Sequence, residues 1–389
     1  MRATLVATAG ARHAFESVDR GRLVKRALIT TRVANMNVHP GQCIAIMAAE
    51  VLPTCLSAEQ RGANPQGIIV RTMKPLTSCL CTLLLATTVA AQNSPNAKSI
   101  PTTKSTASVG SVAVLVGAGD IASCDDLRGA EATAKLIEKI PGTVFAAGDL
   151  AYSDGSDEQF AKCYGPTWGR FKDRTRPAPG NHEYHSDGAS GYVRYFGAAA
   201  GDPKKGYYSY NLGDWHIIVL NSQCVEVGGC GAGSAQEQWL RQDLKDYPAK
   251  CTVAYWHSPL FSSGAKHGND PAVKPLWDAL YAADADVVIN GHDHDYERFA
   301  PQDPDGKLDS SRGIREFVVG TGGKNSHRTF AAPKPNSEVR QADTFGVLKL
   351  TLHPRSFEWE FVPEAGKKFT DSGSGTCHPV APVARRTPQ

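Results

Sequence analysis

Five short polar clusters between residues 119 and 294 contain side chains that could bind metal ions. Carboxylate, phenol, amide and imidazole groups together suit Fe, Mn or Zn, and seven such groups are enough for two metal ions. Two metal ions about 3.5–4 Å apart are a common arrangement for hydrolysing phosphate esters. The candidate metal ligands are Asp120, Asp149, Tyr152, Asn181, His257, His292 and His294.

Four of the clusters follow apolar runs that predict buried β-strands, because the runs are short, continuous and rich in β-branched residues. The cluster around Asn181 follows an apolar, proline-containing approach. In α/β sheets the ligand crevice lies outside the carboxyl ends of the strands, so five chain segments could deliver their side chains to one place. The expected strands are Val112–Val116, Thr143–Ala147, Trp215–Asn221, Cys251–Tyr255 and Asp286–Asn290.

Helical patterns alternate with these strands. Residues 129–140 have helical periodicity, Ser234 and Glu237 form a capping box, and Asp270 before Pro271 indicates another helix start. Strands that alternate with helices predict an α/β domain with helices on the outside. Further strands are expected at Phe317–Val319, Val347–Leu352 and Phe357–Phe361, the last two as a hairpin.

Each cluster alone is a weak signal, because Gly-Asp after a strand is usually a turn and a lone histidine is usually a surface or packed residue. Their joint occurrence, in order, favours a functional site. Gly117, Gly119 and Ala122 also fit a dinucleotide-binding pattern. A helix should then begin at the glycines, but polar residues 123–126 intervene, so we expect no dinucleotide site.

As a set, the clusters resemble the calcineurin-like metallophosphoesterase superfamily, and within it the purple acid phosphatases, over about residues 112–361. The resemblance implies an α/β (α+β sandwich) fold of two packed β-sheets flanked by helices in four layers. Ala122 stands where most members have a histidine, and the purple acid phosphatases supply a tyrosine instead, as Tyr152 does here. One metal ion would be held by Asp120, Asp149, Tyr152 and His294, and the second by Asp149, Asn181, His257 and His292.

Charge suggests which metal ions these would be. Two aspartates, a deprotonated Tyr152 and a bridging hydroxide carry four negative charges, which two divalent ions would only neutralise. One trivalent and one divalent ion leave a positive centre that attracts phosphate. We therefore expect Fe(III) beside Tyr152 with a divalent Fe, Zn or Mn ion, and a centre of two divalent ions as the alternative.

The resemblance implies hydrolysis of phosphate monoesters by attack of a metal-bound hydroxide. His182 and His267 are the candidate catalytic residues, and His185 is a third candidate. Glu183, Asp293 and Asp295 are expected to orient ligand imidazoles. The alternative functions are a phosphodiesterase or nucleotide hydrolase with the same metal centre and, more remotely, a non-catalytic secreted binding protein.

The N-terminal region has the features of a secretory leader. Residues 73–91 combine a basic start, an apolar run and small residues before Gln92, which predicts a signal peptide. Residues 1–72 are then upstream sequence from a mistaken start and are expected to be unstructured, with a transit peptide as the alternative. A linker (92–111), the catalytic domain (112–378) and a tail (379–389) would follow in a secreted or periplasmic protein.

The composition and charge of the chain exclude several classes of protein. With 41% hydrophobic and 21% charged residues, the chain is neither disordered, collagen-like nor a polytopic membrane protein. The net charge is +3, but residues 1–72 carry +5, so residues 73–389 carry −2, which argues against nucleic-acid binding. We expect a small phosphate ester as substrate and no transmembrane anchor. Six cysteines in the expected mature chain suggest disulfides, with Cys224–Cys230 as the preferred pair.

Overall fold

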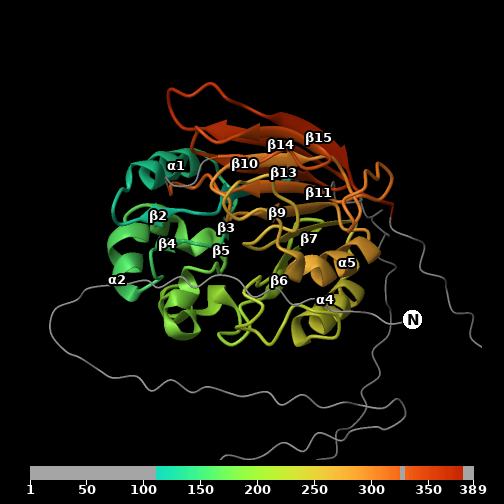
Figure 1. Ribbon diagram of the computed structural model, residues 1–389, viewed down its shortest axis with the longest axis horizontal. Coiled ribbons are helices and arrows are strands. Elements are labelled where there is room, and N and C mark those ends of the chain that lie inside the picture. The colour runs from blue at the N-terminus through green and yellow to red at the C-terminus, as the bar shows by residue number, and fades with distance from the viewer. Residues whose placement is uncertain (1–110, 325–328, 380–389) are drawn as a thin grey trace, which may run out of the picture. The chain divides into compact units, whose positions relative to one another are not determined.

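The computed structural model describes residues 111–324 and 329–379, and these form two β-sheets flanked by helices (Figure 1). The expected upstream sequence and signal peptide, and the linker up to residue 110, lie outside the described residues. So does the tail from residue 380. In the parts of the chain that the structure describes, no helix is long and apolar enough to cross a membrane.

The first sheet has six strands and the second has seven. The order in the first sheet is β15 (Ser372–Thr376), β14 (Ser356–Pro363), β13 (Gly346–His353), β1 (Ala113–Ala118), β3 (Thr143–Ala147) and β5 (Thr175–Ala178). The order in the second sheet is β12 (Ser337–Gln341), β10 (Tyr296–Phe299), β11 (Arg315–Val319), β9 (Val287–Asn290), β8 (Cys251–Tyr255), β7 (Trp215–Val219) and β6 (Tyr208–Leu212). A short parallel pair joins β2 (Ala122–Ser123) to β4 (Ala151–Tyr152).

The central strands are apolar on both faces because both faces are covered. Along β8, Val253 and Tyr255 point into the core that includes residues of both sheets, whereas Ala254 points into a second core. Leu240 of α4 (Ala235–Asp246) and Trp277 of α5 (Lys274–Ala282) belong to this second core. Successive strand residues face opposite sides, so a continuous apolar run is the pattern of a sheet buried on both faces.

The remaining helices lie nearer the first sheet. Figure 1 shows α1 (Arg128–Lys139), α2 (Asp157–Gln159) and α3 (Ser190–Phe196) apart from α4 and α5. The α1 helix joins parallel strands β1 and β3 and packs against β13. The expected fold class, two packed sheets flanked by helices, is confirmed.

Most predicted elements are present within a few residues of their expected ends. Residues Thr143–Ala147 and Cys251–Tyr255 form β3 and β8 with the predicted bounds, and β13 and β14 form the expected hairpin. The Ser234 hydroxyl accepts a hydrogen bond from the Glu237 backbone at 3.3 Å and caps α4. The sequence reading missed β5, β6, β10, β12 and β15, whose runs are short, polar or rich in glycine.

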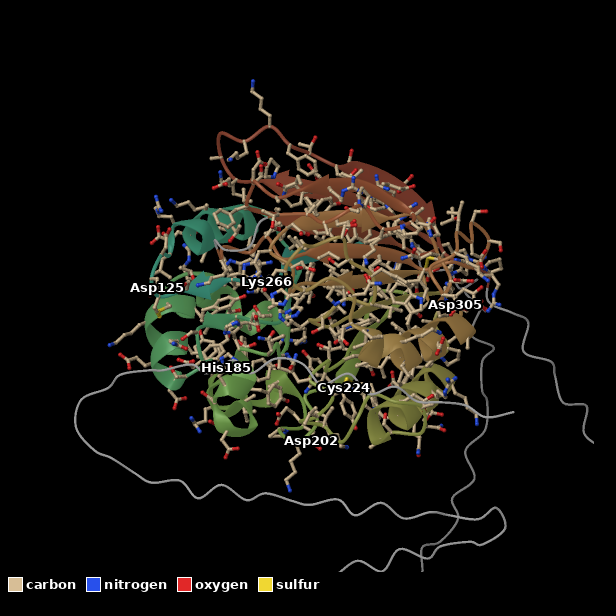
Figure 2. All side chains as sticks on the ribbon, viewed as in Figure 1. Asp125, His185, Asp202, Cys224, Lys266 and Asp305 are labelled. Carbon is tan, nitrogen blue, oxygen red and sulfur yellow. A yellow bond between two sulfur atoms is a disulfide. The ribbon has the colours of Figure 1, made fainter. Side chains whose placement is uncertain are left out.

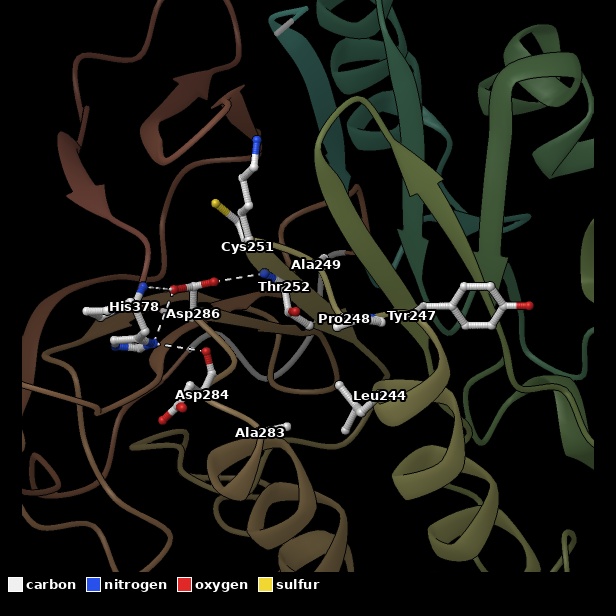
Figure 3. Close-up of a pocket in the computed structure, with 12 residues that line it drawn as sticks. Leu244, Tyr247, Pro248, Ala249, Cys251, Thr252, Ala283, Asp284, Asp286 and His378 are labelled. Atoms are coloured by element: carbon white, nitrogen blue, oxygen red, sulfur yellow. Dashed lines mark hydrogen bonds and ion pairs between the residues drawn. The ribbon is translucent and has the colours of Figure 1, made fainter. Parts of the chain in front are cut away.

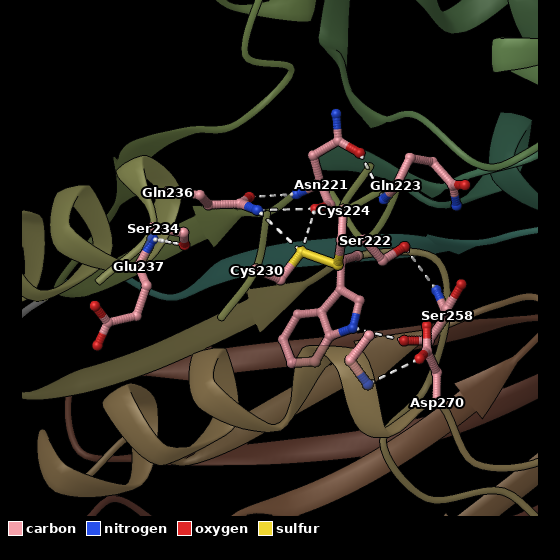
Figure 4. The surroundings of a disulfide bond; sticks show 12 residues. Asn221, Ser222, Gln223, Cys224, Cys230, Ser234, Gln236, Glu237, Ser258 and Asp270 are labelled. Carbon is pink, nitrogen blue, oxygen red and sulfur yellow. Dashed lines mark hydrogen bonds between the residues drawn. A yellow bond between two sulfur atoms is a disulfide. The ribbon is translucent and has the colours of Figure 1, made fainter. Parts of the chain in front are cut away.

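Three disulfides join the six cysteines of the described region. They are Cys124–Cys163, Cys224–Cys230 and Cys251–Cys377. The preferred pair, Cys224–Cys230, is confirmed (Figure 4), and it closes a loop whose end is held by Gln236. The Gln236 side chain accepts from the Asn221 backbone N–H at 2.8 Å and donates to the Asn221 carbonyl at 2.9 Å.

The Cys251–Cys377 disulfide ties the end of the described chain to β8. It lies beside the pocket of Figure 3, which Cys251, Asp286 and His378 line. Asp286 supports the same junction, because its carboxylate accepts the backbone N–H groups of Thr252 at 2.8 Å and His378 at 2.7 Å. Both sulfurs bond to each other, so the adjacent group of Cys251, Asp286 and Cys377 has no free thiolate for a metal ion.

Removing Cys251–Cys377 by a double substitution to alanine should destabilise the protein more than removing Cys224–Cys230. The first bridge spans 126 residues and the second spans 6. Loop-closure entropy then predicts losses of about 5 and about 2 kcal/mol in the free energy of unfolding. Urea unfolding of both double variants beside the wild type measures this difference. Equal losses would contradict the expected dependence of the stabilisation on loop length.

Candidate metal centre

The seven predicted ligands lie together at the carboxyl ends of strands from both sheets. Asp120 and Asp149 each lie two residues beyond the end of a strand, β1 and β3, in the first sheet. His257 and His292 have the same position after β8 and β9 in the second sheet. Asn181 follows β5, a strand that the sequence indicated only by its proline-containing approach.

The first group of ligands surrounds the Asp120 carboxylate. The Tyr152 hydroxyl lies 2.8 Å from Asp120 Oδ1 and 3.1 Å from Asp149 Oδ2. His294 Nε2 lies 3.2 Å from Asp120 Oδ1 and 3.3 Å from the Tyr152 hydroxyl. These four side chains therefore direct their donor atoms to one point.

The second group surrounds His257 Nε2. This nitrogen lies 3.2 Å from Asp149 Oδ2, 3.2 Å from Asn181 Oδ1 and 3.1 Å from His292 Nδ1. Asp149 Oδ2 belongs to both groups, as a ligand shared by two metal ions must. The other nitrogen of His257 donates to the Ala147 carbonyl at 2.9 Å, which fixes the ring with Nε2 toward the site.

The electrostatics of the site are those of a cation-binding pocket. Asp120 and Asp149 are at most 1% exposed. Burial alone would lower the pKa of His257, but the carboxylates of Asp149 and Asp120 raise it to about 10. Burial, with the neighbouring His257 and His267, lowers the pKa of His292 to about 3. In this arrangement His257 carries a proton that compensates the buried carboxylates, and a bound metal ion would displace it.

The donor set fits two metal ions. Oxygen and imidazole donors in two groups that share a carboxylate match the chemistry of Fe, Zn and Mn sites. Burial and the charges of Asp120 and Asp149 raise the pKa of the Tyr152 phenol well above its usual value. The expected phenolate therefore requires a highly charged cation beside it. Without one, Tyr152 donates a hydrogen bond to the carboxylates.

The backbone around the ligands is unusual for non-glycine residues. Asp120, Asp149 and His292 have φ values of 60°, 53° and 74°, in the left-handed region that costs energy for most residues. Glycines make room for the carboxylates: a methyl group at Gly180 would overlap Asp149, and one at Gly291 would overlap Asp120. The glycines before Asn181 and His292 therefore have a steric role beyond turn formation.

Glu183 holds the backbone of the site and does not orient an imidazole, which corrects the expectation from sequence. Its buried carboxylate accepts the backbone N–H groups of Asp149 at 2.9 Å, Leu150 at 2.8 Å and Gly180 at 2.8 Å. Burial and the charge of Asp149 raise the pKa of Glu183 to about 7. The residue fixes the loop after β3 against the loop after β5.

Of the two histidines after Asn181, only His182 lines the candidate site. Nδ1 of His182 and Nδ1 of His185 donate to the same acceptor, the Ser153 carbonyl, at 2.6 and 2.9 Å. Nε2 of His182 lies 3.8 Å from Asp149 Oδ2. His185, which Figure 2 labels, is half exposed and does not line the cavity.

His267 lies at the same cavity, with its ring centroid 3.9 Å from that of His292. Burial lowers its pKa, although Asp293 acts in the opposite direction. The Asp293 carboxylate accepts from the backbone N–H of His267 at 3.2 Å and of Gly268 at 2.9 Å. Asp293 therefore positions the loop that carries His267, whereas sequence reasoning expected it to orient a ligand imidazole.

The cavity has a volume of about 440 Å³ and includes two lysines that the sequence reading did not single out. Lys266 lies on the His267 loop, and Lys324 follows β11 in a glycine-rich turn. Lys324 reaches the cavity because β11 is parallel to β9 and ends at the same edge of the sheet. The rest of the lining is Asp149, Tyr152, Ser153, Asn181, His182, His267, His292 and His294.

The dinucleotide-binding pattern does not lead into a helix, and three large aromatic residues lie away from the cavity. After Gly117 and Gly119 the chain enters β2, and α1 begins only at Arg128, so no helix N-terminus meets the glycines. Tyr164, Trp168 and Tyr192 are buried in the core and do not line the cavity. These rings pack and do not stack on a substrate in this cavity.

Comparison with known proteins finds similar chains among the phosphoesterases. Residues 115–296 match the family model for calcineurin-like phosphoesterases. The chain is 30% identical over 235 residues to probable purple acid phosphatase 20 of Arabidopsis thaliana, which covers 52% of this chain and 53% of that protein. It is 26% identical over 238 residues to an uncharacterized protein of Mycobacterium tuberculosis, covering 49% and 44%. The chain thus spans about half the length of these curated relatives.

Solved structures share the fold. Purple acid phosphatase PPD1 from yellow lupin (Lupinus luteus) superposes with a TM-score of 0.56 at 20% identity, over 69% of this chain and 54% of that one. GAP50, the anchor in the inner membrane complex of Plasmodium, superposes with a TM-score of 0.52 at 14% identity, over 69% and 89%. Residues 115–296 of this chain therefore match the model of the calcineurin-like phosphoesterase family, and the chain is similar in sequence and fold to purple acid phosphatases.

Proposed function

We propose that this protein is a secreted, dinuclear-metal phosphatase that hydrolyses phosphate monoesters. The observation that carries the proposal is the arrangement of seven oxygen and imidazole donors in two groups that share Asp149. The resemblance to purple acid phosphatases supports the reaction class. Metal ions held there would lower the pKa of a water molecule and neutralise phosphoryl oxygens, with Fe(III) beside Tyr152 and a divalent ion in the other group.

The residues of the chain have separate parts in this reaction. Asp120, Asp149, Tyr152 and His294 would hold one metal ion, and Asn181, His257 and His292 complete the second group with Asp149. His182 would protonate or hydrogen-bond the leaving oxygen, because its Nδ1 is committed to the Ser153 carbonyl and its Nε2 remains for the substrate. His267 would contact the phosphoryl group from the second loop at the cavity.

Secretion is part of the proposal. Three disulfides in the described region suit an oxidising compartment, in agreement with the signal peptide expected at residues 73–91. Cell fractionation of the native producer, with reporter fusions to residues 73–91 and to 92–110, tests this expectation. Export by the first segment alone supports it.

Replacing His182 with alanine should lower kcat by about 100-fold or more, the usual contribution of a general acid, while metal content stays near that of the wild type. His185→Ala is the matched control, because His185 donates to the same carbonyl but lies outside the cavity. Steady-state kinetics and elemental analysis of both variants provide the measurement. Parallel loss of activity and metal in His182→Ala would make the residue structural.

The ester preference distinguishes the proposal from its alternative. Metal-replete protein should have a higher kcat/KM for an aryl phosphate monoester than for the matching diester, and His257→Ala should reduce both to background, since it removes the residue central to the second group. A diester preference would instead indicate a phosphodiesterase with the same metal centre. Activity that survives in His257→Ala would argue against this metal centre altogether.

A further inference from the structure

Lys324 places a positive charge at the wall of the cavity. Its ammonium donates to the Ser123 hydroxyl at 3.0 Å and lies 4.9 Å from the centroid of the Tyr152 ring. Among the described residues, no carboxylate lies within 4.0 Å of this ammonium. An ammonium has three donors, so Lys324 retains hydrogen-bonding capacity toward the cavity.

The backbone of Lys324 is fixed to the metal-binding segment. Its N–H donates to the Asp120 carbonyl at 2.9 Å, and the N–H of Gly322 donates to the Gly119 carbonyl at 2.9 Å. The Thr133 hydroxyl donates to the Gly322 carbonyl at 2.6 Å. These bonds set the position of the lysine stem relative to Asp120, as a residue that recognises one substrate group requires.

Lys266 is the natural comparison, since it lines the same cavity. Its side chain is exposed (Figure 2), and it lies on the loop that carries His267. Within the described residues, no hydrogen bond or ion pair fixes its ammonium. Both lysines are cationic and line the same cavity, but only the ammonium of Lys324 is fixed by a hydrogen bond among the described residues.

The charge of the cavity wall favours a substrate with more than one negative charge. Among the described residues that line the cavity, Asp149 is the one carboxylate, and it lies in both ligand groups, whereas Lys266 and Lys324 are both cationic. A phosphate monoester carries about −1.5 to −2 charges at pH 7, and a diester carries about −1. The monoester also has one more unesterified oxygen to accept a charge-assisted hydrogen bond.

From this placement we propose that Lys324 is a specificity-determining residue whose ammonium binds an unesterified phosphoryl oxygen and favours monoesters over diesters. The proposal rests on the proposed phosphatase function and deepens it. The ammonium lies against Tyr152, whose hydroxyl contacts the carboxylates of Asp120 and Asp149, so a phosphoryl group held at metal ions there would come within reach of Lys324.

The test is Lys324→Met, with Lys324→Arg as the variant that retains charge and Lys349→Met on the β13 surface as the unrelated control. At pH 7, Lys324→Met should lower kcat/KM for an aryl phosphate monoester by about 10- to 100-fold, the range of a charge-assisted hydrogen bond. The matching diester should lose less than about threefold. Lys324→Arg should keep most of the monoester preference, and Lys349→Met should keep all of it.

Two further measurements separate substrate binding from an effect on the metal centre. Calorimetric titration with inorganic phosphate should give weaker binding for Lys324→Met, while metal content by elemental analysis stays unchanged. Equal losses on both esters, accompanied by loss of metal, would overturn the proposal and assign Lys324 to support of Tyr152. Collapse of the preference in Lys266→Met but not in Lys324→Met would also overturn it.

Failure of the proposed phosphatase function can be distinguished from failure of the proposal for Lys324. If the wild type hydrolyses neither ester, the phosphatase assignment fails, yet the phosphate titration still tests Lys324. Weaker phosphate binding by Lys324→Met than by the wild type would then support an anion-binding role, and identical binding would exclude it.

Discussion

The rest of the site depends on two buried, neighbouring carboxylates whose negative charges must be compensated. Asp120 and Asp149 are withdrawn from water, and an uncompensated buried charge is costly. The protein compensates them with imidazoles, above all with His257, whose proton is held by these carboxylates. Metal ions bound at the proposed centre would take the place of that proton, and the same carboxylates would then be their ligands. Ionisation of Tyr152 also depends on a bound cation, because burial and the two carboxylates raise the pKa of its phenol.

The two-sheet fold makes this concentration of charge possible. Each sheet brings the ends of parallel strands to one edge, and the edges are joined by bonds that involve the ligands themselves. The His292 backbone donates to Asp120 at 2.8 Å, and His257 donates to the Ala147 carbonyl at the end of β3. Glu183 binds the first-sheet loops together by accepting several backbone N–H groups. The hydrogen bonds that join the strand ends therefore also hold Asp120, Asp149 and His292 in their left-handed backbone conformations.

The strands that lead to the site could be predicted because they are buried on both faces, which leaves continuous apolar runs such as Cys251–Tyr255. Strand β5 was harder to find, since Thr175–Ala178 is short and contains proline. The identity of the candidate ligands followed from donor chemistry and position after a strand. The role of Glu183 could not be predicted in this way, because its partners are backbone N–H groups, which nearly every residue has whatever its side chain. Lys324 was overlooked for a related reason: its turn lies far along the chain, and only the parallel pairing of β11 with β9 brings it to the site.

Calorimetric titration of metal-depleted protein with Fe or Zn tests the central claim, that two groups of donors joined by the buried carboxylate of Asp149 form a dinuclear centre. The wild type should bind two equivalents of metal per chain. Asp149→Asn should weaken both, since this carboxylate lies in both groups, whereas Asn181→Ala should weaken only one. Binding of no metal, or two equivalents unaffected by Asp149→Asn, would contradict the claim.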